Sequence, residues 1–170
     1  MIKNPILSGF NPDPCICRKG EDYYMAVSSF EWFPGIPVYH SKDLKNWELY
    51  THVLTDDSVV DLKKLPSAKG IWAPCLTYCE KEDLFYVVYG VMNSMNARYF
   101  DVDNYLITAK DIKGPWSESV YIHSSGFDAS ILHDDDGRKY IVSLEWETRE
   151  GYEKPGAICM VEYSSEKKEI

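Results

Sequence analysis

Apolar and polar residues alternate over three similar stretches of the chain, and each stretch predicts a β-hairpin. The stretches are CICRKGEDYYMAVSS (15–29), CLTYCEKEDLFYVVYG (75–90) and ILHDDDGRKYIVSLEW (131–146). Each contains a short apolar strand, a charged turn, an aromatic residue and a second, alternating strand, as expected for antiparallel strands joined by a tight turn. No part of the chain has the periodicity of an amphipathic helix.

A second pattern follows each hairpin and predicts further strands. VYHSKDLKNWELY (38–50) and YLITAKDIKGPWSES (105–119) both give a strand, a Lys-Asp turn and a tryptophan, and ICMVEYSSEKKEI (158–170) is a weaker copy. A repeated unit of four antiparallel strands is typical of the blades of a β-propeller, with an ordinary antiparallel sandwich as the alternative. Propellers close with roughly four to eight blades. Two blades and most of a third therefore predict that residues 1–170 are the incomplete N-terminal portion of a propeller domain.

The composition of the chain argues against some classes of binding partner. The chain has 170 residues, is 45% hydrophobic and carries a net charge of −9. This acidic balance argues against nucleic acid, which requires a basic surface. No apolar run is long enough for a signal peptide or a membrane span, so we expect no membrane association and a cytoplasmic location. We expect no cofactor.

Cysteine usage points to reduced thiols. The chain has five cysteines, an odd number, and no signal peptide. Cys15 and Cys17 alternate along one predicted strand and are interpreted as small core residues. Neither Cys15–Cys17 nor Cys75–Cys79 has a usual zinc spacing, so we predict no metal site.

The stretch GFNPDPCI (9–16) fixes a carboxylate. Asp13 lies between Pro12 and Pro14. The two prolines restrict the backbone on both sides of Asp13, and Pro14 also disfavours a helical conformation for Asp13 itself. Such a segment is either a simple turn or a device that points one carboxylate in a definite direction.

The repeat aligns Asp13 with residues of the other two blades. Counted back from Tyr24, Tyr86 and Tyr140, similar offsets lead to Asp13, to Ala73 with its neighbour Trp72, and to Asp128. These residues are predicted to meet at one end of the central channel. Two carboxylates with aromatic side chains nearby suit glycoside hydrolysis, in which one carboxylate handles water or attacks the sugar and another acid protonates the leaving oxygen.

Other aromatic and acidic residues also have predicted roles, either in the site or in a turn. Trp72, and Phe30 at the end of YMAVSSF, are candidates to contact a sugar ring. Asp134–Gly137 is interpreted as the hairpin turn of the third blade. Glu145 and Glu147, which flank Trp146, are possible channel carboxylates.

Three segments resemble β-xylosidases of glycoside hydrolase family 43. They are NPDPCICRKGEDYYMAVSSFEWFPGIPVYHSKDLKNW, IWAPCLTY and FDASILHDDDGRKYIV. The resemblance implies a five-bladed β-propeller that hydrolyses with inversion. It implies that Asp13 is the general base, that Asp128 raises the pKa of the general acid and orients it, and that Phe30 and Trp72 line the sugar subsite. The family's general acid is a glutamate in a Glu-Gly-Pro-His type motif, which this chain lacks.

Several functions stay open at this point. The first is an inverting, exo-acting β-xylosidase that releases xylose from xylo-oligosaccharides, with an α-L-arabinofuranosidase of the same family as its nearest alternative. A retaining fructan-processing enzyme shares the five-bladed fold but uses an early aspartate as nucleophile. A catalytically inactive truncated or sugar-binding propeller fragment is the non-enzymatic alternative. A full-length enzyme is expected to be a possible homo-oligomer.

Overall fold

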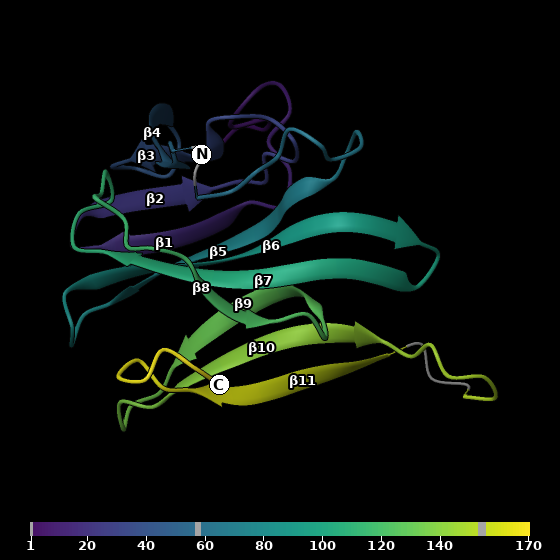
Figure 1. Ribbon diagram of the computed structural model, residues 1–170. Coiled ribbons are helices and arrows are strands. Elements are labelled where there is room, and N and C mark those ends of the chain that lie inside the picture. Colours follow the sequence, from purple (N-terminus) through teal and green to yellow (C-terminus); the bar gives the residue numbers. More distant parts are fainter. Residues whose placement is uncertain (1, 57–58, 153–155) are drawn as a thin grey trace.

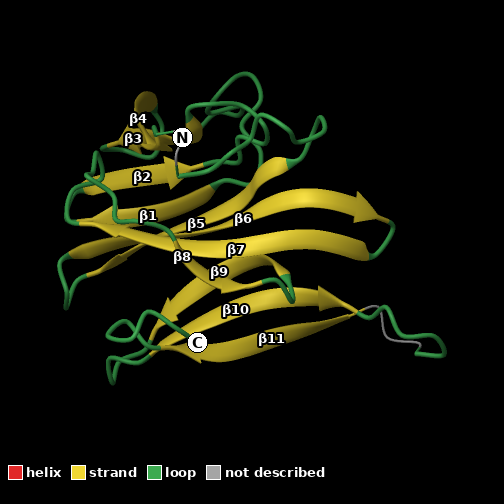
Figure 2. Ribbon diagram, viewed as in Figure 1, coloured by secondary structure: helices red, strands yellow, loops and turns green. Residues whose placement is uncertain are grey.

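The protein is built entirely from β-strands. The computed structural model describes residues 2–56, 59–152 and 156–170, and no helix occurs among them (Figures 1 and 2). The strands are β1 (Cys15–Lys19), β2 (Asp22–Ala26), β3 (Gly35–Ser41), β4 (Glu48–Leu54), β5 (Gly70–Cys79), β6 (Leu84–Asn96), β7 (Tyr99–Ala109), β8 (Val120–His123), β9 (Phe127–His133), β10 (Lys139–Trp146) and β11 (Gly156–Tyr163). The described residues therefore offer no helix that could cross a membrane.

The strands form three antiparallel sheets, each made from a continuous piece of chain. Their strand orders are β1-β2-β3-β4, β5-β6-β7-β8 and β11-β10-β9. The three predicted hairpins are confirmed as β1-β2, β5-β6 and β9-β10, and the tyrosines Tyr24, Tyr86 and Tyr140 each lie in the second strand. The all-β fold is confirmed, and three successive sheets exclude the two-sheet sandwich.

The Lys-Asp motif of the repeat is a turn held by its aspartate. Between β3 and β4, Asp43 Oδ1 accepts backbone N–H bonds from Lys45 at 2.9 Å and Asn46 at 2.8 Å. These bonds hold the pKa of Asp43 well below its usual range. Between β7 and β8, Asp111 Oδ1 accepts the backbone N–H of Lys113 at 2.8 Å. The same side-chain chemistry therefore closes the corresponding turn in both sheets.

The core lies between neighbouring sheets. One apolar cluster joins the first two sheets and includes Ile36, Ile71 and Phe85, each at most 1% exposed. A second cluster joins the second and third sheets and includes Val88 and Ile141. Strand β5 contacts both β1 and β9, so the first strands of the three sheets lie side by side (Figure 1). This packing brings residues from distant parts of the sequence to one end of the three strands.

An ion pair also links the second sheet to the third. The Lys139 ammonium, whose side chain is only 5% exposed, lies 2.6 Å from Glu82 Oε1, and Glu82 is 36% exposed. Burial tends to raise the pKa of Glu82, but hydrogen bonds from Lys139 and Tyr86 outweigh it and leave this pKa lowered. The charge of Lys139 is therefore tolerated inside the protein because Glu82 balances it.

We predict that Glu82→Gln destabilises the protein by about 1–3 kcal/mol at neutral pH, because it leaves the Lys139 charge buried without its counter-charge. A lowered carboxylate pKa stabilises the fold above its unfolded value and ceases to do so as the pH falls through the folded value. The difference between the variant and the parent should therefore shrink in acid. Urea unfolding followed from neutral to acidic pH measures this.

Asp83→Asn provides the control for this prediction. Asp83 is 70% exposed and pairs with Lys19 at 2.7 Å on the surface. Its φ of 48° suits asparagine as well as aspartate. An exposed pair contributes little, so this variant should lose much less stability than Glu82→Gln. Equal losses in the two variants would show that burial of Lys139 is not what makes Glu82 important.

Candidate active site

Asp13 is held in a definite orientation just before β1. Its φ is 52°, in the left-handed region that aspartate enters more readily than most residues. Its Oδ2 accepts a hydrogen bond of 2.6 Å from the Ser28 hydroxyl. The side chain is otherwise exposed to solvent, and the bond to Ser28 occupies only one of its two oxygens. Asp13 is therefore fixed yet accessible.

Ser28 connects Asp13 to the second sheet. It is buried, its N–H donates to the Pro12 carbonyl at 3.0 Å, and its Oγ accepts the N–H of Ala73 at 2.8 Å. The pairing of β5 with β6 shifts register between Trp72 and Cys75, so the Ala73 N–H is released from the ladder. Nothing in the sequence singled out Ser28, which lies in an ordinary Ser-Ser pair.

Asp128 lies close to Asp13, although 115 positions separate them along the printed sequence. It is the second residue of β9, has a φ of 51° and is exposed to solvent. Partial burial raises the pKa of Asp128, and the negative charge of Asp13 raises it further. The structure thus brings together the two carboxylates that the repeat had aligned.

The three aligned positions share one backbone conformation. Asp13, Ala73 and Asp128 have φ values of 52°, 37° and 51°. Left-handed backbone at a residue other than glycine costs energy and persists only where the surroundings enforce it. It recurs just before β1, at the register shift within β5 and at the second residue of β9, and this supports the predicted equivalence of the three positions.

Phe30 and Trp72 form a wall beside the carboxylates. Beyond the end of β2, Phe30 forms an isolated bridge in which Phe30 and Ile71 exchange two N–H···O bonds of 3.0 Å. The Phe30 and Trp72 rings lie edge to face, with centroids 6.0 Å apart. Gly70 makes this approach possible, because a Cβ there would lie 2.3 Å from the Phe30 carbonyl oxygen. Both predicted aromatic residues are therefore together.

The aromatic wall continues across all three sheets. Trp72 contacts Phe100 at 6.1 Å, Phe100 contacts Phe127 at 4.7 Å, and Phe127 stacks on Trp146 at 5.8 Å, measured between centroids. The row ends at Trp146, and its member Phe127 directly precedes Asp128 in the chain. Sequence reasoning did not connect Phe100 or Phe127 to the site.

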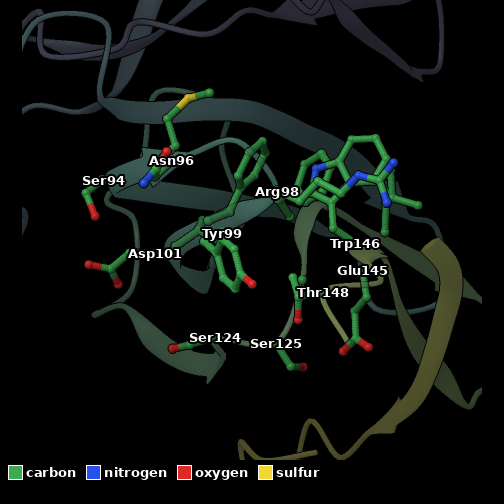
Figure 3. A pocket seen from close by; sticks show the side chains of 16 residues that line it. Ser94, Asn96, Arg98, Tyr99, Asp101, Ser124, Ser125, Glu145, Trp146 and Thr148 are labelled. Atoms are coloured by element: carbon green, nitrogen blue, oxygen red, sulfur yellow. The ribbon is translucent and has the colours of Figure 1, made fainter. Parts of the chain in front are cut away.

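Phe100, Phe127 and Trp146 of this row help to line a pocket of about 560 Å³ (Figure 3). In Figure 3, Glu145, Trp146 and Thr148 line one side, with Ser94 and Asp101 opposite. None of Asp13, Phe30, Trp72 and Asp128 lines it. We therefore place the candidate active site at Asp13 and Asp128 rather than in this pocket.

The two glutamates proposed as channel carboxylates lie apart from the pair. Glu145 lines the pocket of Figure 3 and hydrogen-bonds Cys159 on β11. Glu147 forms a bidentate ion pair with Arg149, which lowers the pKa of Glu147 to about 2. Burial and then the Asp13 carboxylate raise the pKa of Asp128, without a contribution from either glutamate. The hairpin turn predicted at Asp134–Gly137 is confirmed by the bond from Gly137 N–H to the Asp134 carbonyl at 3.0 Å.

The chain is similar to known proteins that are named xylosidases. The chain is 47% identical over 169 residues to a β-xylosidase of Bacillus subtilis (strain 168), covering 99% of this chain and 31% of that protein. It is 50% identical over 148 residues to xylosidase/arabinosidase 43B of Humicola insolens, covering 87% of this chain and 27% of that protein. The chain thus spans about a third of the length of these relatives.

A solved structure gives the same result. The crystal structure of xylan β-1,4-xylosidase from Bacillus halodurans C-125 superimposes with a TM-score of 0.94 at 47% identity, covering 99% of this chain and 32% of that one. The sequence profile of Glycosyl hydrolases family 43 matches residues 2–170. The chain therefore belongs to glycosyl hydrolase family 43.

Proposed function

We propose that the protein is a glycoside hydrolase that releases xylose from the non-reducing end of xylo-oligosaccharides with inversion. The observation that carries this proposal is the Asp13 carboxylate, fixed by Ser28, open to solvent and next to Asp128. Membership of family 43 and the printed names of its relatives support it. We propose further that the three sheets are the first three blades of a five-bladed propeller, and that residues 1–170 are the N-terminal portion of that domain.

Asp13 acts as the general base in this proposal. Its Oδ2 is engaged by Ser28, which leaves Oδ1 to take a proton from the water that attacks the anomeric carbon. In an inverting enzyme the carboxyl groups of the base and the acid lie about 6.5–9.5 Å apart, which leaves room for that water between the base and the sugar. The acid is proposed to be a glutamate outside the three sheets.

Asp128 has a different role from Asp13. A carboxylate near another acid disfavours the ionised form of that acid, as Asp13 already does to Asp128. We propose that Asp128 keeps the general acid protonated and oriented. Phe30 and Trp72 would contact the apolar face of the sugar and exclude water from the bond that breaks.

An α-L-arabinofuranosidase is the second candidate, because one relative is named a xylosidase/arabinosidase. The ratio of kcat/KM for nitrophenyl β-xyloside to that for nitrophenyl α-arabinofuranoside distinguishes them. A ratio above one supports the xylosidase, and a ratio well below one supports the arabinofuranosidase. The absence of hydrolysis of either by the whole protein would favour a sugar-binding propeller.

We predict that Asp13→Asn lowers kcat on xylobiose by roughly 10²–10⁴-fold, because asparagine cannot accept the proton from water. Asparagine tolerates the left-handed backbone at this position, so the fold should persist. In the parent, proton NMR of early reaction mixtures should show α-xylose as the first product. First-formed β-xylose would establish retention and overturn the inverting proposal.

Asp136→Asn is the matched control for this variant. Asp136 lies in the exposed hairpin turn of the third sheet, where it pairs with Arg138 at 2.6 Å. Its replacement removes one carboxylate from the same protein, far from the proposed chemistry, and should leave kcat unchanged. Normal turnover by Asp13→Asn would remove Asp13 from the mechanism.

Ser28→Ala tests whether orientation of Asp13 matters. The variant removes the 2.6 Å bond to Asp13 and the acceptor for Ala73 N–H. We expect kcat to fall about tenfold with little change in KM, because a misplaced base affects the transition state more than binding. Ser28→Thr, which restores a hydroxyl, should recover part of kcat. A variant of unchanged kcat would reduce Ser28 to a structural residue.

Asp128→Asn should raise the melting temperature at neutral pH while lowering activity. A carboxyl whose folded pKa is raised costs stability once the pH exceeds that pKa, and this cost vanishes below its unfolded pKa near 4. The gain should therefore be full at neutral pH and absent near pH 3. Thermal melts across this range measure it, and an Asp128→Asn protein that is less stable at neutral pH would contradict the proposed repulsion.

A further inference from the structure

Two cysteine thiols from different sheets meet beside the proposed active site. Cys15 opens β1, Cys75 lies in β5, and each thiol shifts the pKa of the other, as expected for neighbouring side chains. The Cys15 thiol also donates to the carbonyl oxygen of Leu76 at 3.5 Å. Both cysteines are free; Cys75 packs against the second apolar cluster, whereas Cys15 is partly exposed, so small reagents can reach Cys15. The sequence had suggested a core role for Cys15, but Cys15 belongs to no core cluster of the described residues.

The contrast with Cys17 shows that position selects one thiol. Cys17 follows on the same face of β1 and packs against the core, where burial raises its pKa to about 12. It therefore stays a thiol, as the sequence predicted. The hydrogen bond from Cys75 instead lowers the pKa of Cys15 to about 7, and the same bond raises the pKa of Cys75. Cys15 is thus the nucleophile of the pair and Cys75 its neutral partner.

We propose that Cys15 and Cys75 are a thiol–disulfide site that responds to hydrogen peroxide and joins β1 covalently to β5. An accessible, nucleophilic cysteine beside a second cysteine is the arrangement of sites that oxidise reversibly. The Cys15 thiol lies 3.5 Å from the carbonyl oxygen of Leu76, the residue after Cys75, and β1 packs against β5, so the geometry places the two thiols within reach of each other.

The chemistry proceeds in two steps. The Cys15 thiolate attacks one peroxide oxygen, an S–O bond forms as the O–O bond breaks, and the departing hydroxide takes up a proton to become water. The Cys75 sulfur then attacks the sulfur of Cys15, the S–S bond forms as the S–O bond breaks, and a second water leaves. Two thiols thereby lose two electrons and two protons, and one peroxide is reduced to two waters.

The position of the disulfide connects it to the carboxylate site. Cys15 follows Asp13 after one intervening proline, and Cys75 follows Ala73 after another. Asp13 and Ala73 are the two ends of the hydrogen-bond chain through Ser28. The disulfide would therefore lie two residues beyond each end of that chain and would link β1 to β5.

The test uses the full-length protein, reduced, desalted and treated with a small excess of hydrogen peroxide. We expect the intact mass to fall by about 2 Da and the titratable thiols to fall by two, with a cross-linked peptide pair containing Cys15 and Cys75. Dithiothreitol should reverse both changes. An unchanged mass, a disulfide between two molecules, or a bridge that uses Cys17 would each overturn the proposal.

Serine variants separate the two roles. Cys15→Ser should abolish the oxidation, whereas Cys75→Ser should stop it at the sulfenic acid, which dimedone traps on Cys15. Cys159→Ser is the matched control, because Cys159 is also half-buried and lies on β11 in another sheet. It should leave the disulfide intact. Dimedone labelling of Cys75 in the Cys15→Ser variant would reverse the assignment, and loss of the disulfide in Cys159→Ser would refute the pairing.

Discussion

The hydroxyl of Ser28 is the contact on which the candidate site depends. It donates to Asp13 and accepts from Ala73, so a single buried oxygen sets the position of a carboxylate in front of β1 relative to a bulge in β5. A buried hydroxyl with two partners restricts their positions more than apolar packing does. If either partner moves, the buried hydroxyl loses a hydrogen bond. The Phe30–Ile71 bridge holds the same two sheets together at their aromatic side.

The repeated pattern predicted the parts of this structure that are local. Hairpins, turns and the equivalence of Asp13, Ala73 and Asp128 follow from alternation and spacing, which act over a few residues. Ser28 and the thiol pair were not predicted, because their partners lie on other sheets and their own sequence surroundings carry no signal. Phe100 and Phe127 were missed for the same reason. Their role depends on how three sheets pack, which no single hairpin encodes.

Two like charges at one end of the sheets are an arrangement that stability alone would not favour. The Asp13 carboxylate raises the cost of ionising Asp128, and both residues occupy left-handed backbone. The apolar clusters between the sheets offset these costs, with residues such as Val88 and Ile36 fully buried. Such local exceptions to otherwise consistent packing are expected where a protein performs chemistry.

The left-handed backbone that Asp13, Ala73 and Asp128 share limits which replacements protein engineering can introduce at these positions. A saturation library at Asp13 or Asp128 would be filtered by folding before any activity is selected, since most side chains strain this conformation and only glycine, asparagine and aspartate enter it readily. The survivors would be dominated by those residues whatever the substrate. Altered specificity is therefore better sought at Trp72, Phe100 and Phe127, none of which has a positive φ.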